Sequence, residues 1–231
     1  MADESIPPGE VIDPKDDAKV PVILRPFPHI EVHVDAGEVR FDGIACLDVG
    51  WLEQVVCSPQ TREHESLIVT EARPSHLHAA LLATGFEPGT PGRWSYDNDE
   101  VSVSPPSGAE IRVEVMYVDR SGATVRESIG TWIRDYRGEH EFPASEWVFG
   151  GSRMRKAPAS MGEREIYEAD YSGSVIGLVT FGDEVLGWSE VLADQEAVHP
   201  PEWEVNTAHV PPPGTAVTVI LSLAAKPAPG D

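Results

Sequence analysis

The sequence is poor in cysteine and has no long apolar run. Its 231 residues include only Cys46 and Cys57, too few for the disulfide framework of a small secreted domain. The two thiols either form one bridge that closes a short loop or stay free. No stretch of about 18 apolar residues is present, so the sequence predicts no membrane-spanning helix.

Positive charge is also scarce. Lysine and arginine together number 17, against 39 aspartate and glutamate residues, and the formal net charge is −22. This excess of negative charge would repel a phosphate backbone, which argues against nucleic-acid binding. The acidic residues are dispersed along the chain, so they predict a solvated acidic surface and mark no single site.

Several catalytic and cofactor-binding motifs are absent. The chain has no Gly-x-Ser-x-Gly nucleophile motif, no His-Glu-x-x-His zinc motif and no glycine-rich phosphate-binding loop. The acidic run Asp97–Glu100 lacks the spacing and the glycine of a calcium-binding loop, which favours a solvated turn. Enzymes are therefore the least favoured class, and no nucleotide or organic cofactor is indicated.

The chain is rich in glycine and proline, which separate short apolar segments. It contains 20 glycines and 21 prolines, and hydrophobic residues make up 41% of it. This combination favours turns, short strands and a packed core over long helices. We expect one α+β domain over residues 28–223, built mainly from an antiparallel sheet with long turn-rich loops. Residues 1–27 read as a flexible acidic leader and residues 224–231 as a flexible tail.

Three hairpins are predicted, each from two strand-like segments around a short turn that contains glycine. Their strands cover residues 29–34 with 38–42, 110–118 with 123–129, and 174–181 with 184–191. Residues 86–109 are rich in Pro, Gly, Ser and Asp, so they predict a long surface connection.

One short helix is predicted over about residues 75–84. Ser75 is a good N-cap, and Gly85 supplies a C-terminal stop. Leu77 and Leu81 would share one face of this helix and pack against the sheet.

The side chains best suited to metal binding or catalysis lie around the start of this helix. A thiol, a carboxylate and two imidazoles lie between residues 57 and 78, namely Cys57, His64, Glu65 and His78. These donors suit a copper or zinc ion. His78 falls in the first turn of the helix, whose positive end keeps the imidazole neutral and able to coordinate.

The spacing of these residues matches no zinc-finger pattern, so a structural reading stays open beside the metal reading. In it, His64 and Glu65 brace the turn before the helix, and Cys57 is a small buried apolar residue. The first functional hypothesis is a metal-binding protein with a Cys/His cluster, and the alternative is a protein–protein interaction or structural module without metal. An enzyme with Cys57 as nucleophile and His64 as base comes third.

Six segments carry a family likeness, and the first two read Thr61-Arg-Glu-His-Glu-Ser-Leu67 and Arg73-Pro-Ser-His-Leu-His-Ala-Ala-Leu-Leu82. The others are residues 85–89, 146–152, 171–179 and 206–220. From about residue 30 to residue 222 the chain resembles the YdjY-like bacterial proteins. The resemblance implies an exported or lipid-anchored protein outside the cytoplasm, periplasmic in location, with motif positions at Cys57, His64, Glu65 and His78. No signal peptide is visible in the polar, proline-interrupted residues 2–20.

Overall fold

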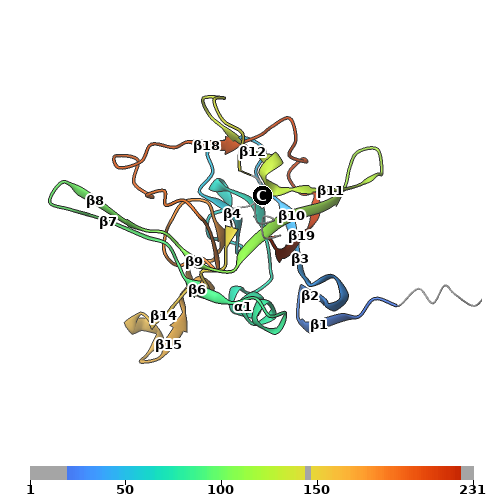
Figure 1. Cartoon of the computed structure of the whole chain (residues 1–231), viewed down its shortest axis with the longest axis horizontal. Helices are drawn as coiled ribbons and strands as arrows, with labels where there is room; N and C mark the ends of the chain where they lie inside the picture. Colours follow the sequence, from blue (N-terminus) through green and yellow to red (C-terminus); the bar gives the residue numbers. More distant parts are fainter. Residues whose placement is uncertain (1–19, 144–146, 225–231) are drawn as a thin grey trace, which may run out of the picture.

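The computed structural model describes residues 20–143 and 147–224 of the chain (Figure 1). Their main element is a sheet of 11 strands, eight of which close into a barrel. Around the ring the strands are β3 (Glu38–Ala45), β19 (Ala216–Leu223), β10 (Glu110–Val118), β13 (Trp147–Val148), β17 (Leu186–Trp188), β16 (Ser174–Gly177), β4 (Gln54–Cys57) and β5 (Ser66–Val69). The pairing of β5 with β3 completes the ring.

Closure of the barrel was not part of the sequence prediction. Its closing pairs are Ile44 with Val69 and Ala45 with Ile68, and they require β5 to approach β3 closely. Gly43 permits this approach, since a Cβ atom at that position would lie 2.5 Å from Cγ2 of Ile68. Most pairings are antiparallel as expected, but β4 with β5 and β16 with β17 are parallel, so the sheet is mixed.

Two of the three predicted hairpins are confirmed. Strand β2 (Ile30–His33) pairs with β3, and β10 pairs with β11 (Thr124–Ser128). At the edge, β1 (Ile23–Phe27) pairs with β2, so residues at the end of the expected leader belong to the sheet. Residues 1–19 and 225–231, most of the expected leader and tail, lie outside the described residues.

The third predicted hairpin is wrong, because β16 and β17 run parallel. The chain between them leaves the sheet instead of turning tightly. The N–H groups of Leu178 and Val179 both donate to the carbonyl oxygen of Glu53, at 3.0 and 2.9 Å, and that of Thr180 donates to Leu192 at 2.8 Å. These bonds hold residues 178–185 in a loop between β16 and β17.

Residues 86–109 lie mostly at the surface as predicted, but they form an arm of strands and not an irregular connection. The arm contains β6 (Pro88–Thr90), β7 (Arg93–Asp97), β8 (Glu100–Ser104) and β9 (Ser107–Gly108). Strand β6 pairs with β9 and β7 with β8, so the arm is two-stranded, and it projects away from the barrel (Figure 1). Two further small sheets join β12 (Ile133–Asp135) to β18 (Trp203–Val205) and β14 (Met154–Lys156) to β15 (Glu165–Tyr167).

The predicted helix is confirmed as α1 (Pro74–Ala83), and α2 (Glu168–Ser172) is a second, shorter one. Single 3₁₀ turns lie at Val34–Ala36, Glu63–Glu65, Ile129–Trp132 and Ala159–Met161. The N-terminus of α1 is capped differently from the expectation. Ser75 lies inside the helix, and its N–H and hydroxyl both donate to the carboxylate of Asp170 in α2, each at 2.8 Å. The cap therefore comes from the other helix.

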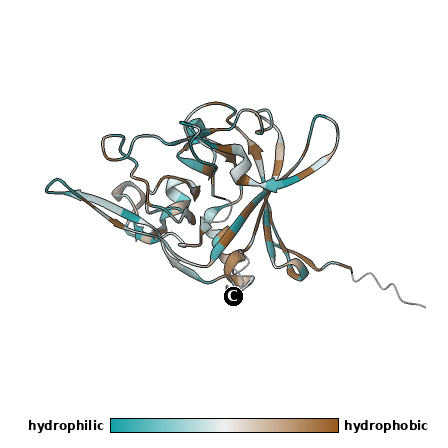
Figure 2. Ribbon diagram, turned by 45° about the horizontal axis from the view of Figure 1, so that its top comes forward, coloured by the Kyte–Doolittle hydropathy of each residue, from teal (hydrophilic) through white to brown (hydrophobic). Residues whose placement is uncertain are grey.

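One apolar core fills the barrel and reaches beneath α1. Along β10 buried residues alternate with more exposed ones, as a strand with one face on the core requires. Figure 2 shows hydrophobic and hydrophilic residues interleaved along the chain. Leu77 and Leu81 of α1 are fully buried, which confirms the predicted helix face. In the described ranges 20–143 and 147–224, no helix is long and apolar enough to cross a membrane.

Candidate functional site

Cys57 ends β4 and is fully buried. Burial raises the pKa of its thiol, even though hydrogen bonds with Ser66 and Thr61 act in the opposite direction. Metal coordination and nucleophilic attack both need a thiolate, so this position favours neither. Cys46 and Cys57 are free thiols, which answers the question left open by the sequence.

His64 and Glu65 lie at the surface in the 3₁₀ turn before β5. The His64 side chain is 73% exposed, and its Nε2 atom lies 3.6 Å from a carboxylate oxygen of Glu65. The two side chains therefore contact each other.

His78 is half-buried in α1 between two aromatic side chains, Phe149, whose ring centroid lies 4.9 Å away, and Tyr167. Its Nδ1 atom lies 2.9 Å from the Tyr167 hydroxyl, which itself donates to the carbonyl oxygen of Gly151 at 2.8 Å. Because the hydroxyl proton is used there, Nδ1–H must be the donor to Tyr167, and the lone pair stays on Nε2. Burial lowers the pKa of His78, which favours the neutral imidazole, although a hydrogen bond to the Gly151 backbone acts in the opposite direction.

The predicted metal residues thus have different neighbours. Among residues 20–143 and 147–224, no group of three or more His, Cys, Asp or Glu side chains is placed to hold a metal ion. Of the four predicted residues, Glu65 is the one that lines a described cavity.

This cavity, named here the carboxylate groove, has a volume of about 220 Å³. Five carboxylic acids and one imidazole line it, namely Glu53, Glu65, Asp194, Glu196, Glu202 and His199. Its walls also include Trp51, Leu192 and Trp203, so charged and apolar surfaces face the same space. Such a mixture of apolar walls and convergent polar groups is typical of ligand sites.

The backbone at the barrel rim places Glu53 and Glu65, the two central acidic residues of the groove, side by side. Glu53 directly precedes β4, and its N–H donates to the carbonyl oxygen of Glu65, directly before β5, at 3.0 Å. The Glu53 carbonyl accepts the two bonds from Leu178 and Val179 described above. Glu53 and Glu65 are therefore neighbours because β4 and β5 start side by side in parallel.

The carboxyl group of Glu53 keeps its proton to higher pH than an ordinary glutamate, because its pKa is raised. Burial, a hydrogen bond to Glu65 and the negative charge of Glu65 raise the pKa of Glu53 to about 7. The ionised form of Glu53 is therefore disfavoured beside Glu65 until the pH rises.

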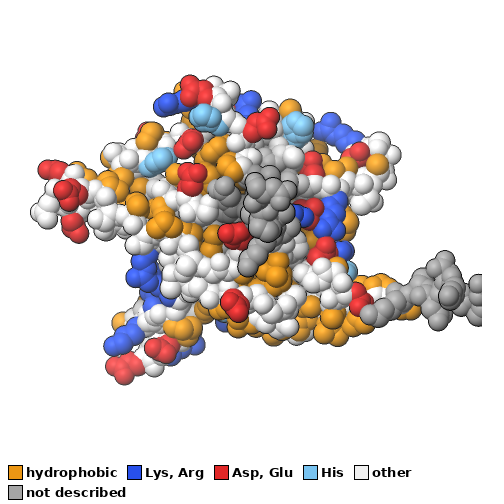
Figure 3. All heavy atoms as spheres, viewed as in Figure 1, with side chains coloured by type: hydrophobic (Ala, Val, Ile, Leu, Met, Phe, Trp, Pro, Cys, Tyr) orange, Lys and Arg blue, Asp and Glu red, His pale blue; other side chains and the backbone are white. Residues whose placement is uncertain are grey.

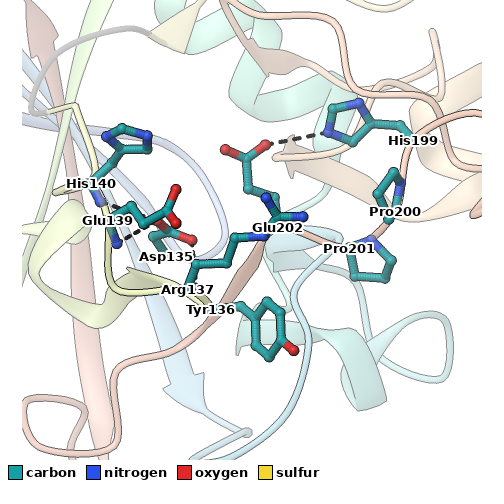
Figure 4. Close-up of a pocket in the computed structure, with 9 residues that line it drawn as sticks. All are labelled: Asp135, Tyr136, Arg137, Glu139, His140, His199, Pro200, Pro201 and Glu202. Atoms are coloured by element: carbon teal, nitrogen blue, oxygen red, sulfur yellow. Dashed lines mark hydrogen bonds and ion pairs between the residues drawn. The ribbon is translucent and has the colours of Figure 1, made fainter.

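An adjoining cavity shares residues 199–202 with the groove (Figure 4). Figure 4 shows Glu202 facing His199, and their nearest atoms are 3.3 Å apart. Asp135 has a structural role there, because it accepts the backbone N–H groups of Arg137, Glu139 and His140. These bonds, the one from Arg137 first, hold the pKa of Asp135 below its usual range.

An exposed aromatic pair borders both cavities. Trp51 is 40% exposed and lines the groove, and Tyr136 lines the adjoining cavity. Their rings meet edge to face with centroids 4.9 Å apart. An indole held in this way offers a rigid face to a ligand.

The sequence reasoning missed most of the groove. Its residues come from short segments around Glu53, Glu65, Val179 and residues 192–203, and no motif joins them. The one local signal is His199-Pro-Pro-Glu202, in which two prolines fix the spacing of an imidazole and a carboxylate.

Comparison with known proteins confirms the resemblance found in the sequence. The sequence model of the YdjY domain matches residues 30–222, from the start of β2 almost to the end of β19. No curated protein and no solved structure matches the chain. The match covers the whole barrel and most of the chain, and the chain belongs to the YdjY domain family.

Proposed function

We propose that this protein is a non-catalytic binding protein and that the carboxylate groove binds an organic cation through an ammonium or guanidinium group. The observation that carries this proposal is the placement of Glu53 and Glu65 side by side in an open, partly aromatic cavity, where the pKa of Glu53 is raised to about 7. A cation placed between the two groups would stabilise the ionised form of Glu53 and release its proton.

Two further features support a cation as the ligand. Trp51 has an exposed indole face beside the carboxylates, and such faces attract ammonium and guanidinium groups. The net charge of −22 would raise the local concentration of cations and speed their association. An organic cation suits the groove better than a metal ion, because the described residues include no group of three metal donors.

The probes for this proposal are acetyl-Gly-Arg-Gly-amide and acetyl-Gly-Lys-Gly-amide, with the Gln peptide as a neutral reference. We expect the two basic peptides to bind in calorimetry and the Gln peptide not to bind. The double variant Glu53→Gln/Glu65→Gln should weaken binding by at least about tenfold, because a hydrogen bond to a charged group contributes about 1.5–3 kcal/mol.

The matched control is Glu87→Gln/Glu110→Gln, which removes the same charge at two exposed positions outside the groove. We expect this control to bind like the unmodified protein. Equal weakening by both double variants would show that the peptides respond to the overall charge and would reject the groove as the site.

Binding of a copper or zinc ion is the second proposal, and His78 is what supports it. Tyr167 fixes the tautomer of His78 so that Nε2 has a free lone pair, and burial favours the neutral ring. Zinc titration of the protein and of His78→Ala tests it, with His76→Ala as the control, whose ring stacks on Phe27. Equal uptake by all three proteins would assign any bound zinc to the acidic surface.

A location outside the cytoplasm is also a proposal, and it rests on the family resemblance alone. Fractionation of cells that make the native protein tests it. Recovery with a periplasmic or outer-surface marker is the expected result, and recovery with a cytoplasmic marker would contradict it.

A further inference from the structure

The ribbon β7–β8 has one apolar face and one polar face. Its cross-strand pairs Trp94 with Val103 and Tyr96 with Val101 lie on one side, and the intervening pair Ser95 with Ser102 lies on the other. Tyr96, Val101 and Val103 are 52%, 50% and 56% exposed. Tyr96, Val101 and Val103 are therefore exposed beside the partly buried Trp94, and these four side chains are named here the ribbon face. The arm that carries them projects into solvent (Figure 1).

The base of this arm is fixed to the barrel by close backbone packing. The N–H of Gly89 donates to the carbonyl oxygen of Phe149 at 2.9 Å, and a Cβ atom at Gly108 would lie 2.1 Å from the same oxygen. A Cβ atom at Gly92 would lie 3.1 Å from Cγ2 of Thr180. The arm is therefore held at one end, while β7 and β8 form a separate sheet of two strands.

The tip of the ribbon concentrates negative charge. Asn98 and Asp99 have positive φ angles of 50° and 63°, as in the two-residue turns that join the strands of a hairpin. Next to them, Asp97 and Glu100 are paired directly across the ribbon. Like charges in such a pair destabilise a hairpin, and Figure 3 shows acidic side chains gathered at this tip. A cationic partner would remove this repulsion.

We propose that an extended segment of a partner protein, in which apolar and basic residues alternate, docks along the edge of the ribbon as a third strand. An isolated two-stranded ribbon is marginal in water and gains from a third strand. The apolar side chains of the segment extend the ribbon face beside Tyr96, Val101 and Val103, and its basic side chains lie on the opposite face, which carries Asp97 and Glu100 at the tip. The same charge disfavours a second copy of this chain or an anionic membrane as the occupant.

The test uses the acetylated and amidated peptide Lys-Val-Lys-Val-Lys-Val as the probe, with the Glu-Val and Lys-Ser hexapeptides as references. It is carried out in the Glu53→Gln/Glu65→Gln background, so that binding in the carboxylate groove does not contribute. We expect the Lys-Val peptide to shift the amide NMR signals of residues 93–104, and each reference peptide to bind at least tenfold more weakly. Equal binding of the Glu-Val or Lys-Ser peptide would overturn the proposal.

Two double variants test the two faces of the ribbon one at a time. Tyr96→Ser/Val101→Ser should weaken binding at least tenfold, and the opposite-face variant Ser95→Ala/Ser102→Ala should leave it unchanged. All four side chains are exposed, so both proteins should keep the thermal midpoint of their parent. No effect of the first variant, or an equal effect of both, would overturn the proposal.

Two alternative occupants are tested with the same proteins. A dimer in sedimentation equilibrium that dissociates on Tyr96→Ser/Val101→Ser would identify a second copy as the occupant. Binding to phosphatidylglycerol vesicles that the same variant abolishes would identify a membrane. Either result would overturn the assignment to a basic segment, and a monomer that does not bind vesicles is the expected result.

Discussion

Leu81→Ala should lower the free energy of unfolding by about 2–5 kcal/mol, because removal of a fully buried leucine side chain leaves a cavity that its neighbours fill only in part. Leu81 lies on the buried face of α1 and belongs to the same apolar cluster as the barrel strands. The loss should appear as a lower midpoint of urea unfolding with little change in the slope.

The control is Leu82→Ala, one position along the same helix, where the side chain is 45% exposed. It should change the free energy of unfolding by less than about 0.5 kcal/mol. Similar losses for the two variants would mean that the assigned buried face of α1 is wrong.

Glu184→Gln should remove a large pH effect on stability. Glu184 is 2% exposed, and burial raises the pKa of its carboxyl group from 4.5 to about 7. Because the pKa is raised on folding, the stability from the protonated form is complete below pH 4.5 and is lost as the pH rises through about 7. A shift of this size corresponds to about 3 kcal/mol lost by the unmodified protein, and glutamine avoids that loss.

The measurement is the difference in unfolding free energy between the protein and Glu184→Gln from pH 5 to pH 8. Other titrating groups, including Glu53, are common to both proteins and cancel in this difference. The variant should gain relative stability with rising pH, whereas Glu190→Gln, at an exposed position, should not. A difference that does not change with pH would contradict a buried carboxyl group with a raised pKa.

The sequence predicts those parts of the fold that depend on near neighbours in the chain. The hairpins β2–β3 and β10–β11 and the helix α1 each follow from alternation, turn residues or a local stop signal. Barrel closure depends on the long-range pairing of Ile44 with Val69, and the capping of α1 depends on Asp170, so neither has a local pattern. The composition of residues 86–109 is typical of a loop, whereas the alternation around Trp94 and Val103 is the local pattern that indicates the strands of the arm.

The same distinction applies to the candidate site. Glu65 and His78 were found because they lie near each other in the sequence, but the structure gives them different neighbours. No sequence pattern indicates a role for Glu53, because its raised pKa comes from burial at the barrel rim and from the carboxyl group of Glu65. The buried environment of Cys57 could not be predicted either, because it depends on how β4 lies between β16 and β5.

The most direct test of the cation-binding groove is calorimetry of acetyl-Gly-Arg-Gly-amide at pH 7 in two buffers that differ in ionisation enthalpy. Glu53 has a pKa of about 7, so it is half protonated at that pH, and binding should release about half a proton per peptide. Affinity should be about tenfold higher at pH 8 than at pH 6, in proportion to the ionised fraction of Glu53, and Glu53→Gln should abolish both effects. Binding without proton release, or with the same affinity at both pH values, would contradict the proposed role of the Glu53–Glu65 pair.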